Sequence, residues 1–171
     1  MIKDLHLESK RFKLRTLDPI SDNFTSYLTW MKSEADNPYI VSIDPLLIGD
    51  DLITYVNEKN ASSDALLLGI FETSGMHHIG NIKFEPINFN SQTTWLGILI
   101  GDTNWRGKGV GSEILRTSME WMRNEFGIKT FHLGVDPSNL PAVKLYRKVG
   151  FSEDPNLSEL PETFVMSYRT Y

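Results

Sequence analysis

The sequence predicts a mixed α/β domain. Several short segments alternate apolar and polar residues or run continuously apolar, which are the patterns of half-buried and buried strands. Other segments space apolar residues three and four positions apart, as on one face of a helix. A glycine-rich turn separates a segment of the first kind, Thr93–Ile100, from one of the second kind, Gly111–Phe126. A strand is therefore expected to lead through this turn directly into a helix.

Near the N-terminus the pattern indicates one strand and two helices. Phe12 and Leu14 alternate with cationic residues and mark the strand. The apolar face expected for the first helix, which Ser21 or Asp22 would cap, consists of Phe24, Tyr27, Leu28 and Met31. The chain then breaks at Asn37-Pro38 and Asp44-Pro45. The second helix, capped by Asp50, is indicated by Ile48, Leu52 and Val56.

Three strands are expected next. Leu66–Phe71 is a continuous apolar run, as in a buried strand. Gly75 turns the chain into a longer strand, His78–Phe84, which is expected to end at Pro86. The third strand is Thr93–Ile100, immediately before the glycine-rich turn.

Two helices and further strands follow the turn. The first helix, Gly111–Phe126, is expected to stop at Gly127, because glycine readily adopts the conformation that ends a helix. The second runs from Asn139 to about Val149 and ends at Gly150. Strand alternation occurs before and after this second helix, at Phe131, Leu133 and Val135, and at Phe164, Met166 and Tyr168. No repeat or linker interrupts the pattern, so residues 1–171 are expected to form a single domain.

Composition narrows the class of protein. The chain has 40% hydrophobic residues, no cysteine and a net charge of −5. These values exclude a disordered chain, a disulfide framework and a thiol nucleophile, and they disfavour nucleic acid as a partner. No apolar run reaches the length of a membrane span, and the first residues show no signal-peptide pattern. A cytoplasmic protein without a membrane partner is expected.

The glycine-rich turn, Arg106-Gly107-Lys108-Gly109-Val110-Gly111, is the most informative motif. It combines consecutive backbone N–H groups, a helix N-terminus and two full positive charges, which together suit a phosphate. The spacing fits neither the dinucleotide fingerprint G-x-G-x-x-G nor the P-loop. A tight connection without a ligand is the structural alternative.

The pattern R-x-x-G-x-G after a strand resembles the acetyl-CoA pyrophosphate loop of the GNAT N-acetyltransferase superfamily. Other segments are similar to its RimJ/RimL-like branch and occur in the family's order: Arg11–Arg15, Ile79–Lys83, Pro86–Asn88, Ile98–Asp102 and Asn139–Phe151. The resemblance implies the GNAT fold. That fold has a central mixed, mostly antiparallel sheet with splayed fourth and fifth strands, and helices on both faces.

The resemblance also implies an enzyme that transfers an acetyl group from acetyl-CoA to a primary amine by direct attack in a ternary complex. Acetyl-CoA would be the co-substrate, and no metal is expected. The residues that would hold it are Ile98, Leu99 and Ile100 of the fourth strand, the loop residues Arg106, Gly107, Lys108, Gly109, Val110 and Gly111, and the helix residues Asn139 and Lys148. Asn139 is equally a candidate helix cap, and Lys148 an ordinary exposed lysine.

In the family, the tyrosine of the L-Y pair lies beside the sulfur, so Tyr146 is expected to be the general acid; the alternative is a packing role. Many relatives have a glutamate two residues before the glycine of the fourth strand, where this chain has Trp95. Glu85 is the nearest alternative base, followed by His78 and Asp102. Without a dedicated base, an amine with a pKa of ~7.7–8.0 suits the site better than a lysine amine at ~10.4.

Residues 20–60, rich in aromatic side chains, are expected to select the acceptor. The expected acceptor is a small amine or an amino-sugar nucleotide. Two alternatives remain, a protein N-terminus of the ribosomal-protein type and a non-catalytic CoA-binding domain. A homodimer also stays open.

Overall fold

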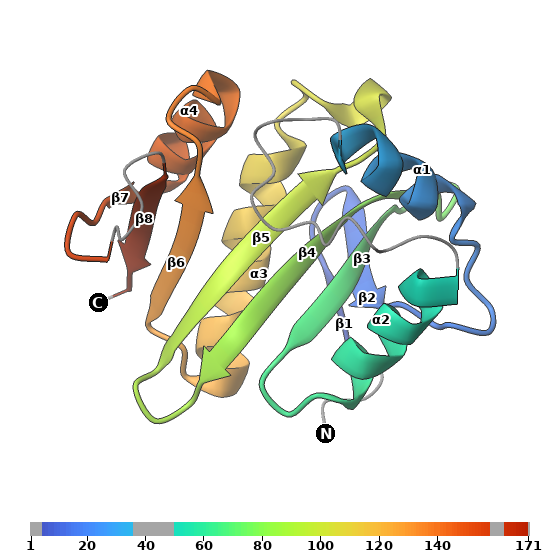
Figure 1. Ribbon diagram of the computed structural model, residues 1–171, viewed down its shortest axis with the longest axis horizontal. Coiled ribbons are helices and arrows are strands. Elements are labelled where there is room, and N and C mark those ends of the chain that lie inside the picture. The colour runs from blue at the N-terminus through green and yellow to red at the C-terminus, as the bar shows by residue number, and fades with distance from the viewer. Residues whose placement is uncertain (1–4, 36–49, 158–162, 171) are drawn as a thin grey trace.

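The computed structural model describes residues 5–35, 50–157 and 163–170. One eight-stranded sheet forms the centre of the described chain, in the order β1-β2-β3-β4-β5-β6-β8-β7 (Figure 1). The strands are β1 (His6–Glu8), β2 (Phe12–Thr16), β3 (Leu66–Glu72), β4 (His78–Asn88), β5 (Thr93–Ile100), β6 (Thr130–Val135), β7 (Ser152–Glu153) and β8 (Phe164–Arg169). The helices are α1 (Thr25–Ala35), α2 (Asp50–Ala61), the short 3-10 turn η1 (Thr103–Trp105), α3 (Val110–Phe126) and α4 (Leu140–Val149).

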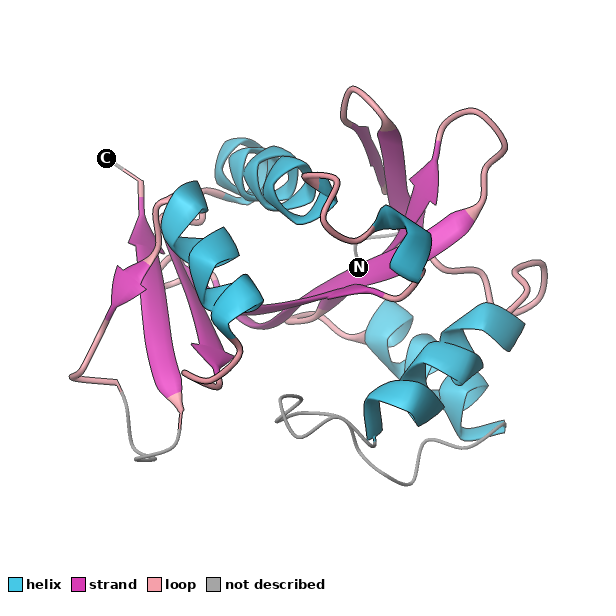
Figure 2. Ribbon diagram, turned by 90° about the horizontal axis from the view of Figure 1, so that it is seen from above, coloured by secondary structure: helices cyan, strands magenta, loops and turns pink. Residues whose placement is uncertain are grey.

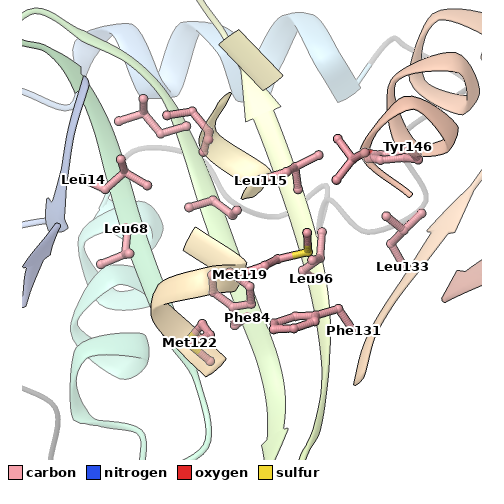
Figure 3. Packing of buried hydrophobic residues seen from close by; sticks show 14 of the residues in the cluster. Leu14, Leu68, Phe84, Leu96, Leu115, Met119, Met122, Phe131, Leu133 and Tyr146 are labelled. Carbon is pink, nitrogen blue, oxygen red and sulfur yellow. The ribbon is translucent and has the colours of Figure 1, made fainter. Parts of the chain in front are cut away.

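The helices lie on both faces of the sheet. Figure 2 shows α3 on one side and the pair α1 and α2 on the other. The larger apolar core lies between the sheet, α3 and α4, and Figure 3 shows Phe84, Phe131, Leu115 and Met119 converging there. A second core packs α1 and α2 against β3, and it includes Tyr27, as the sequence indicates.

β5 and β6 separate along their length. All neighbouring strands pair antiparallel except these two, which run parallel. They pair only at Thr93↔Thr130, Thr94↔Phe131 and Trp95↔His132, so among the described residues the rest of β5 has no strand partner on this side (Figure 1). β5 and β6 are the strands that the expected fold counts as its fourth and fifth and that splay apart there, so the fold prediction is confirmed.

The sequence pattern failed at two places in the N-terminal half. β1 was not predicted, because three residues are too short a run to show alternation. The expected cap of α1 is also wrong. Asp22 instead binds Arg15 through both carboxylate oxygens, and Asn23 Oδ1 accepts from the backbone N–H of Thr25 at 2.9 Å. The competing cation therefore determines which residue caps the helix.

The predicted end of the strand His78–Phe84 at Pro86 is wrong, since β4 continues to Asn88. Phe84 faces Leu96 and Ile87 faces Thr94, so two residues of β4 lie opposite one residue of β5. This β-bulge places the proline where no ladder hydrogen bond is required of it. α2 begins at Asp50, while Ile48 and both X-Pro steps lie outside the described residues.

Candidate active site

A cavity of about 1380 Å³ opens where β5 and β6 separate. It runs along β5 from Trp95 to Ile100 and reaches the glycine-rich turn, α4 and the far wall at Gly134 and Val165. The cavity is lined by the following residues predicted for the site: Glu85, Ile98, Leu99, Ile100, Arg106, Gly107, Gly109, Val110, Gly111, Asn139, Tyr146 and Lys148. Of the residues predicted to hold acetyl-CoA, Lys108 alone does not line it.

The backbone of the glycine-rich turn is arranged to meet a ligand closely. Gly107 and Gly109 have φ angles of +72° and +77°, a region that only glycine adopts without strain. Gly109 is the N-cap of α3 and has no side chain to cap it, so no side chain of the described residues accepts from the N–H groups of the first turn. A Cβ added at Gly107 would meet no atom within 4 Å. The turn therefore offers backbone donors and free space together, which fits a diphosphate.

The two cations of the turn have different positions. The Arg106 Nε donates to the carbonyl of Ile100 at 2.8 Å and ties the turn to the end of β5. The Lys108 ammonium lies 5.9 Å from the centroid of the Trp105 ring, outside the cavity. The structure therefore brings Arg106 to the site but leaves Lys108 beside it.

β5 supplies an open edge to the cavity. Its other edge pairs with β4 at Asn81↔Leu99 and Ile82↔Ile98. Gly80 allows close approach on that side, because a Cβ there would lie 2.2 Å from the carbonyl oxygen of Leu99. Beyond Trp95 the edge of β5 that faces β6 has no strand partner among the described residues, so it is open to an extended ligand, as strand addition requires.

α4 positions Asn139 and Tyr146. Asn139 Oδ1 accepts from the N–H of Ala142 at 3.3 Å, so the cap prediction is confirmed. The Tyr146 ring packs edge-on against Phe151 and is 9% exposed, and burial raises the pKa of its hydroxyl to about 12. The Tyr146 hydroxyl has no hydrogen-bond partner among the described residues. Lys148 is exposed at the end of α4.

Glu85 lies at the opposite end of the cavity from the turn, at the bulge of β4. Its carboxylate contacts the Lys83 ammonium at 3.0 Å and the Lys59 ammonium at 2.5 Å. Partial burial would raise the pKa of Glu85, but hydrogen bonds from both lysines hold the pKa below its ordinary value. A carboxylate stabilised in this way is a weak proton acceptor.

The other two candidate bases do not line the cavity. His78 stacks on Phe71 at 4.8 Å, and its Nε2 lies 3.0 Å from both the Gly80 carbonyl and Asn81 Oδ1. Asp102 accepts from the N–H of Asn104 and contacts His77. Both residues therefore hold local structure.

Two cavity residues, Asn81 and Lys83 of β4, were missed from the sequence. They line the cavity on the side of α1 and α2, where it also includes Tyr55 of the aromatic-rich region expected to select the acceptor. Asn81 and Lys83 are two positions apart and alternate with the apolar residues Ile82 and Phe84, so they share one face of β4. This spacing was the signal that could have found them.

Within the described ranges, no helix is long and apolar enough to cross a membrane. In the same ranges, no three histidine, cysteine or carboxylate residues are grouped as they would be to hold a metal ion.

A family model described as "Acetyltransferase (GNAT) family" matches residues 22–151. The chain belongs to the GNAT acetyltransferase family. The family predicted from the glycine-rich turn and the α4 segment is thus confirmed, and the cavity occupies the splay that this GNAT fold creates between β5 and β6.

Among curated GNAT relatives, the probable N-acetyltransferase YjcK of Bacillus subtilis is 28% identical over 60% of this chain. The match spans 56% of YjcK, little more than half its length. The spermine/spermidine N(1)-acetyltransferase of Bacillus subtilis is 21% identical over 71% of this chain and 86% of its own. The structure of RimL, a ribosomal L7/L12 alpha-N-protein acetyltransferase in complex with coenzyme A, matches with a TM-score of 0.78. It is 14% identical over 94% of this chain and 95% of its own, so the likeness is one of fold.

Proposed function

We propose that this chain binds acetyl-CoA and transfers the acetyl group to a primary amine by direct attack in a ternary complex. One observation carries the proposal: a single cavity joins the glycine-rich turn, the open edge of β5 and Tyr146. Membership of the GNAT family supports it, as does the fold shared with a RimL structure that contains coenzyme A.

Different residues along the cavity bind the two ends of acetyl-CoA and take part in the reaction. The N–H groups around Gly107 and Gly109 bind the diphosphate, with Arg106 nearby. The open edge of β5 holds the pantetheine arm in an extended form and presents an N–H to the thioester oxygen. When bound, acetyl-CoA supplies an acyl group that is already activated. Tyr146, protonated at neutral pH, donates a proton to the departing thiolate.

The amine must lose its proton before it attacks. Glu85 is the candidate base, but its lowered pKa makes it a weak one, and Trp95 occupies the place of the family's glutamate. We therefore propose that the amine enters largely neutral, which favours amines of low pKa. A small amine or an amino-sugar nucleotide is the preferred acceptor.

A second candidate acceptor is a protein N-terminus, because the RimL structure shares the fold and its printed name describes alpha-N-protein acetylation. An α-amine at ~7.7–8.0 also meets the need for a neutral nucleophile. Comparison of kcat/KM for small amines and N-terminal peptides decides between them. A peptide that exceeds every small amine by tenfold or more, about 1.4 kcal/mol, would overturn the preference.

Calorimetric titration with acetyl-CoA tests the binding step. We expect one site per chain, and Gly109→Trp should abolish binding by filling the turn. Gly75→Trp is the matched control, because Gly75 lies in the exposed turn between β3 and β4, outside the cavity. No binding to the unmodified chain at millimolar ligand would refute the proposal. Binding without acetyl transfer to any amine would instead indicate a CoA-binding domain.

A further inference from the structure

The half of the cavity over β4 presents hydrogen-bond donors and positive charge. Asn81 and Lys83 line it from the same face of the strand, and Tyr27 and Tyr55 line it from α1 and α2. Glu85 is the only carboxylate among the described residues that line the cavity, and two lysines already bind it. This half lies on the face of the sheet that α1 and α2 cover.

Asn81 has an unused donor. Its side chain is 4% exposed, and Nδ2 is the one buried side-chain polar atom without a hydrogen-bond partner in the described part of the chain. The orientation of the amide follows from His78. The Nε2 of His78 lies 3.0 Å from the Gly80 carbonyl, which can only accept, so Nε2 donates and the Asn81 oxygen is the atom that faces it.

An unsatisfied buried donor costs about 1–3 kcal/mol. A ligand that supplies an acceptor atom to the Asn81 Nδ2 would recover this free energy. The donor therefore indicates an oxygen acceptor on the molecule that occupies this half of the cavity.

Lys83 adds a full charge beside this donor. Lys59, Lys83 and Glu85 together carry two positive charges and one negative charge. Burial alone would lower the pKa of Lys83, but Tyr55 and Glu85 raise it, so the ammonium stays charged. An ammonium has three donors, and its two partners, Glu85 and Tyr55, leave one of them for a ligand.

We infer that this half of the cavity binds an acceptor amine that also bears an anionic oxygen group, a carboxylate or a phosphate, held by Asn81 Nδ2 and Lys83 Nζ. The inference rests on the proposed function and specifies its substrate class. Successive same-face positions of a strand are about 7 Å apart, so one anionic group can accept from both side chains.

The same charge explains how the site works without a strong base. A positive charge close to an amine disfavours the protonated form of that amine. The lysines thus promote the neutral nucleophile, while the anionic group of the acceptor restores attraction to the site. A polyamine, which has positive charges and no anionic group, is a poor match.

Two matched pairs of acceptors test the inference. One pair is L-alanine and L-alaninamide, and the other is glucosamine 6-phosphate and glucosamine. Values of kcat/KM are corrected for the neutral fraction of each amine, with spermidine as a polycation. We expect the anionic member to be preferred about tenfold or more in at least one pair, as for a hydrogen bond to a charged group. The pair with the larger preference distinguishes carboxylate from phosphate.

Variants then assign the preference to residues. Lys83→Met should reduce it to about twofold or less, and Lys83→Arg should retain it, because arginine keeps the charge. Lys10→Met is the matched control, since Lys10 is exposed between β1 and β2. Asn81→Asp, which is nearly isosteric, should lower kcat/KM for the anionic acceptors more than for the neutral ones. It provides a second readout if Lys83→Met is poorly folded.

Failure of the inference differs from failure of the proposed function. If acetyl-CoA does not bind, the proposed function falls. If acetyl-CoA binds but no anionic acceptor is preferred, or spermidine is the best acceptor, the function stands and the inference is overturned. A preference unchanged in both Lys83→Met and Asn81→Asp also overturns it, as does the absence of transfer to all four paired amines.

Discussion

Arg11 and Glu113 join the start of β2 to the first turn of α3. The Arg11 Nε lies 2.8 Å from Glu113 Oε2, and the backbone N–H of Arg11 donates to Oε1 at 3.0 Å. The same guanidinium donates through Nη2 to the carbonyl of Lys108 at 3.2 Å. The glycine-rich turn is therefore held in position by residues outside the cavity.

Replacement of Glu113 by alanine should weaken both the fold and the turn. Glu113 accepts hydrogen bonds from Arg11 and from the hydroxyl of Ser9, and their loss should lower the free energy of unfolding by about 1–3 kcal/mol. The Kd for acetyl-CoA should rise up to about tenfold, because the turn loses its support. Denaturant titration and calorimetry measure the two effects. Glu8→Ala is the control, since its 4.0 Å contact with Lys13 is exposed and worth at most about 0.5 kcal/mol.

The Glu113 contacts also predict a pH dependence. Burial would raise the pKa of Glu113, but hydrogen bonds from Ser9 and Arg11 lower it. The carboxylate therefore stabilises the fold above its unfolded pKa of about 4.3, and this stabilisation is lost as the pH falls through the folded pKa. The stability difference between the unmodified chain and Glu113→Ala should shrink on acidification. A difference that stays constant from pH 6 to the acid transition would contradict this account.

Tyr146→Phe should separate catalysis from stability. The hydroxyl has no hydrogen-bond partner in the described chain, so its removal should change the free energy of unfolding little. If it is the general acid, kcat should fall about 10²–10⁴-fold while the KM for acetyl-CoA stays nearly constant. Because the pKa of Tyr146 is raised to about 12, kcat should show no alkaline fall below about pH 11 from this group. Tyr168→Phe, outside the cavity, is the control, and equal kcat in both variants would reassign the acid to water.

Local patterns predicted most of the fold because they report directly on burial. The run Leu66–Phe71 and the glycine that ends α3, Gly127, lie where the pattern placed them. The pattern failed where a distant residue competes. Arg15 takes the carboxylate of Asp22 that would otherwise cap α1, and the bulge that admits Pro86 depends on β5.

The candidate site could also be predicted except where distant contacts decide. Motif positions such as Gly107 and Tyr146 line one cavity as expected, because a resemblance to a family includes its tertiary arrangement. Lys108 belongs to the motif but turns toward Trp105, and nothing local predicts that contact. The unpaired amide of Asn81 depends on His78 and on the packing around it, so only a structure can show it.

His78 should make stability depend on pH near neutrality. It contacts Phe71, Trp30 and Tyr27, and this burial lowers its pKa, although hydrogen bonds to Asn81 and Gly80 and the charge of Asp22 oppose the shift. Arg15 lowers it further. The unfolded chain then binds a proton at about pH 6.5 that the folded chain does not, so stability should decrease as the pH falls from 7 to 5.

Denaturant titration at several pH values measures this effect. His78→Gln should flatten the pH dependence between 7 and 5, because it removes the titrating group. His6→Gln, at an exposed site on β1, should leave the slope unchanged. A slope that is equal in the unmodified chain and His78→Gln would assign the titration to another group.

Glu85→Gln tests whether this carboxylate removes the proton of the amine. A general base is worth about 10²–10⁴-fold, so a loss of that size in kcat would establish the role. We expect less than about tenfold, because Lys59 and Lys83 hold Glu85 in its ionised form. The pH at which kcat/KM levels off should follow the pKa of each acceptor amine rather than a fixed enzyme group.

The Glu85→Gln variant also leaves both ammonium groups without a counter-charge, so the KM of an anionic acceptor should fall while that of its neutral partner should not. A rise in the KM of the anionic acceptor would show that Glu85 binds the amine instead of neutralising the lysines.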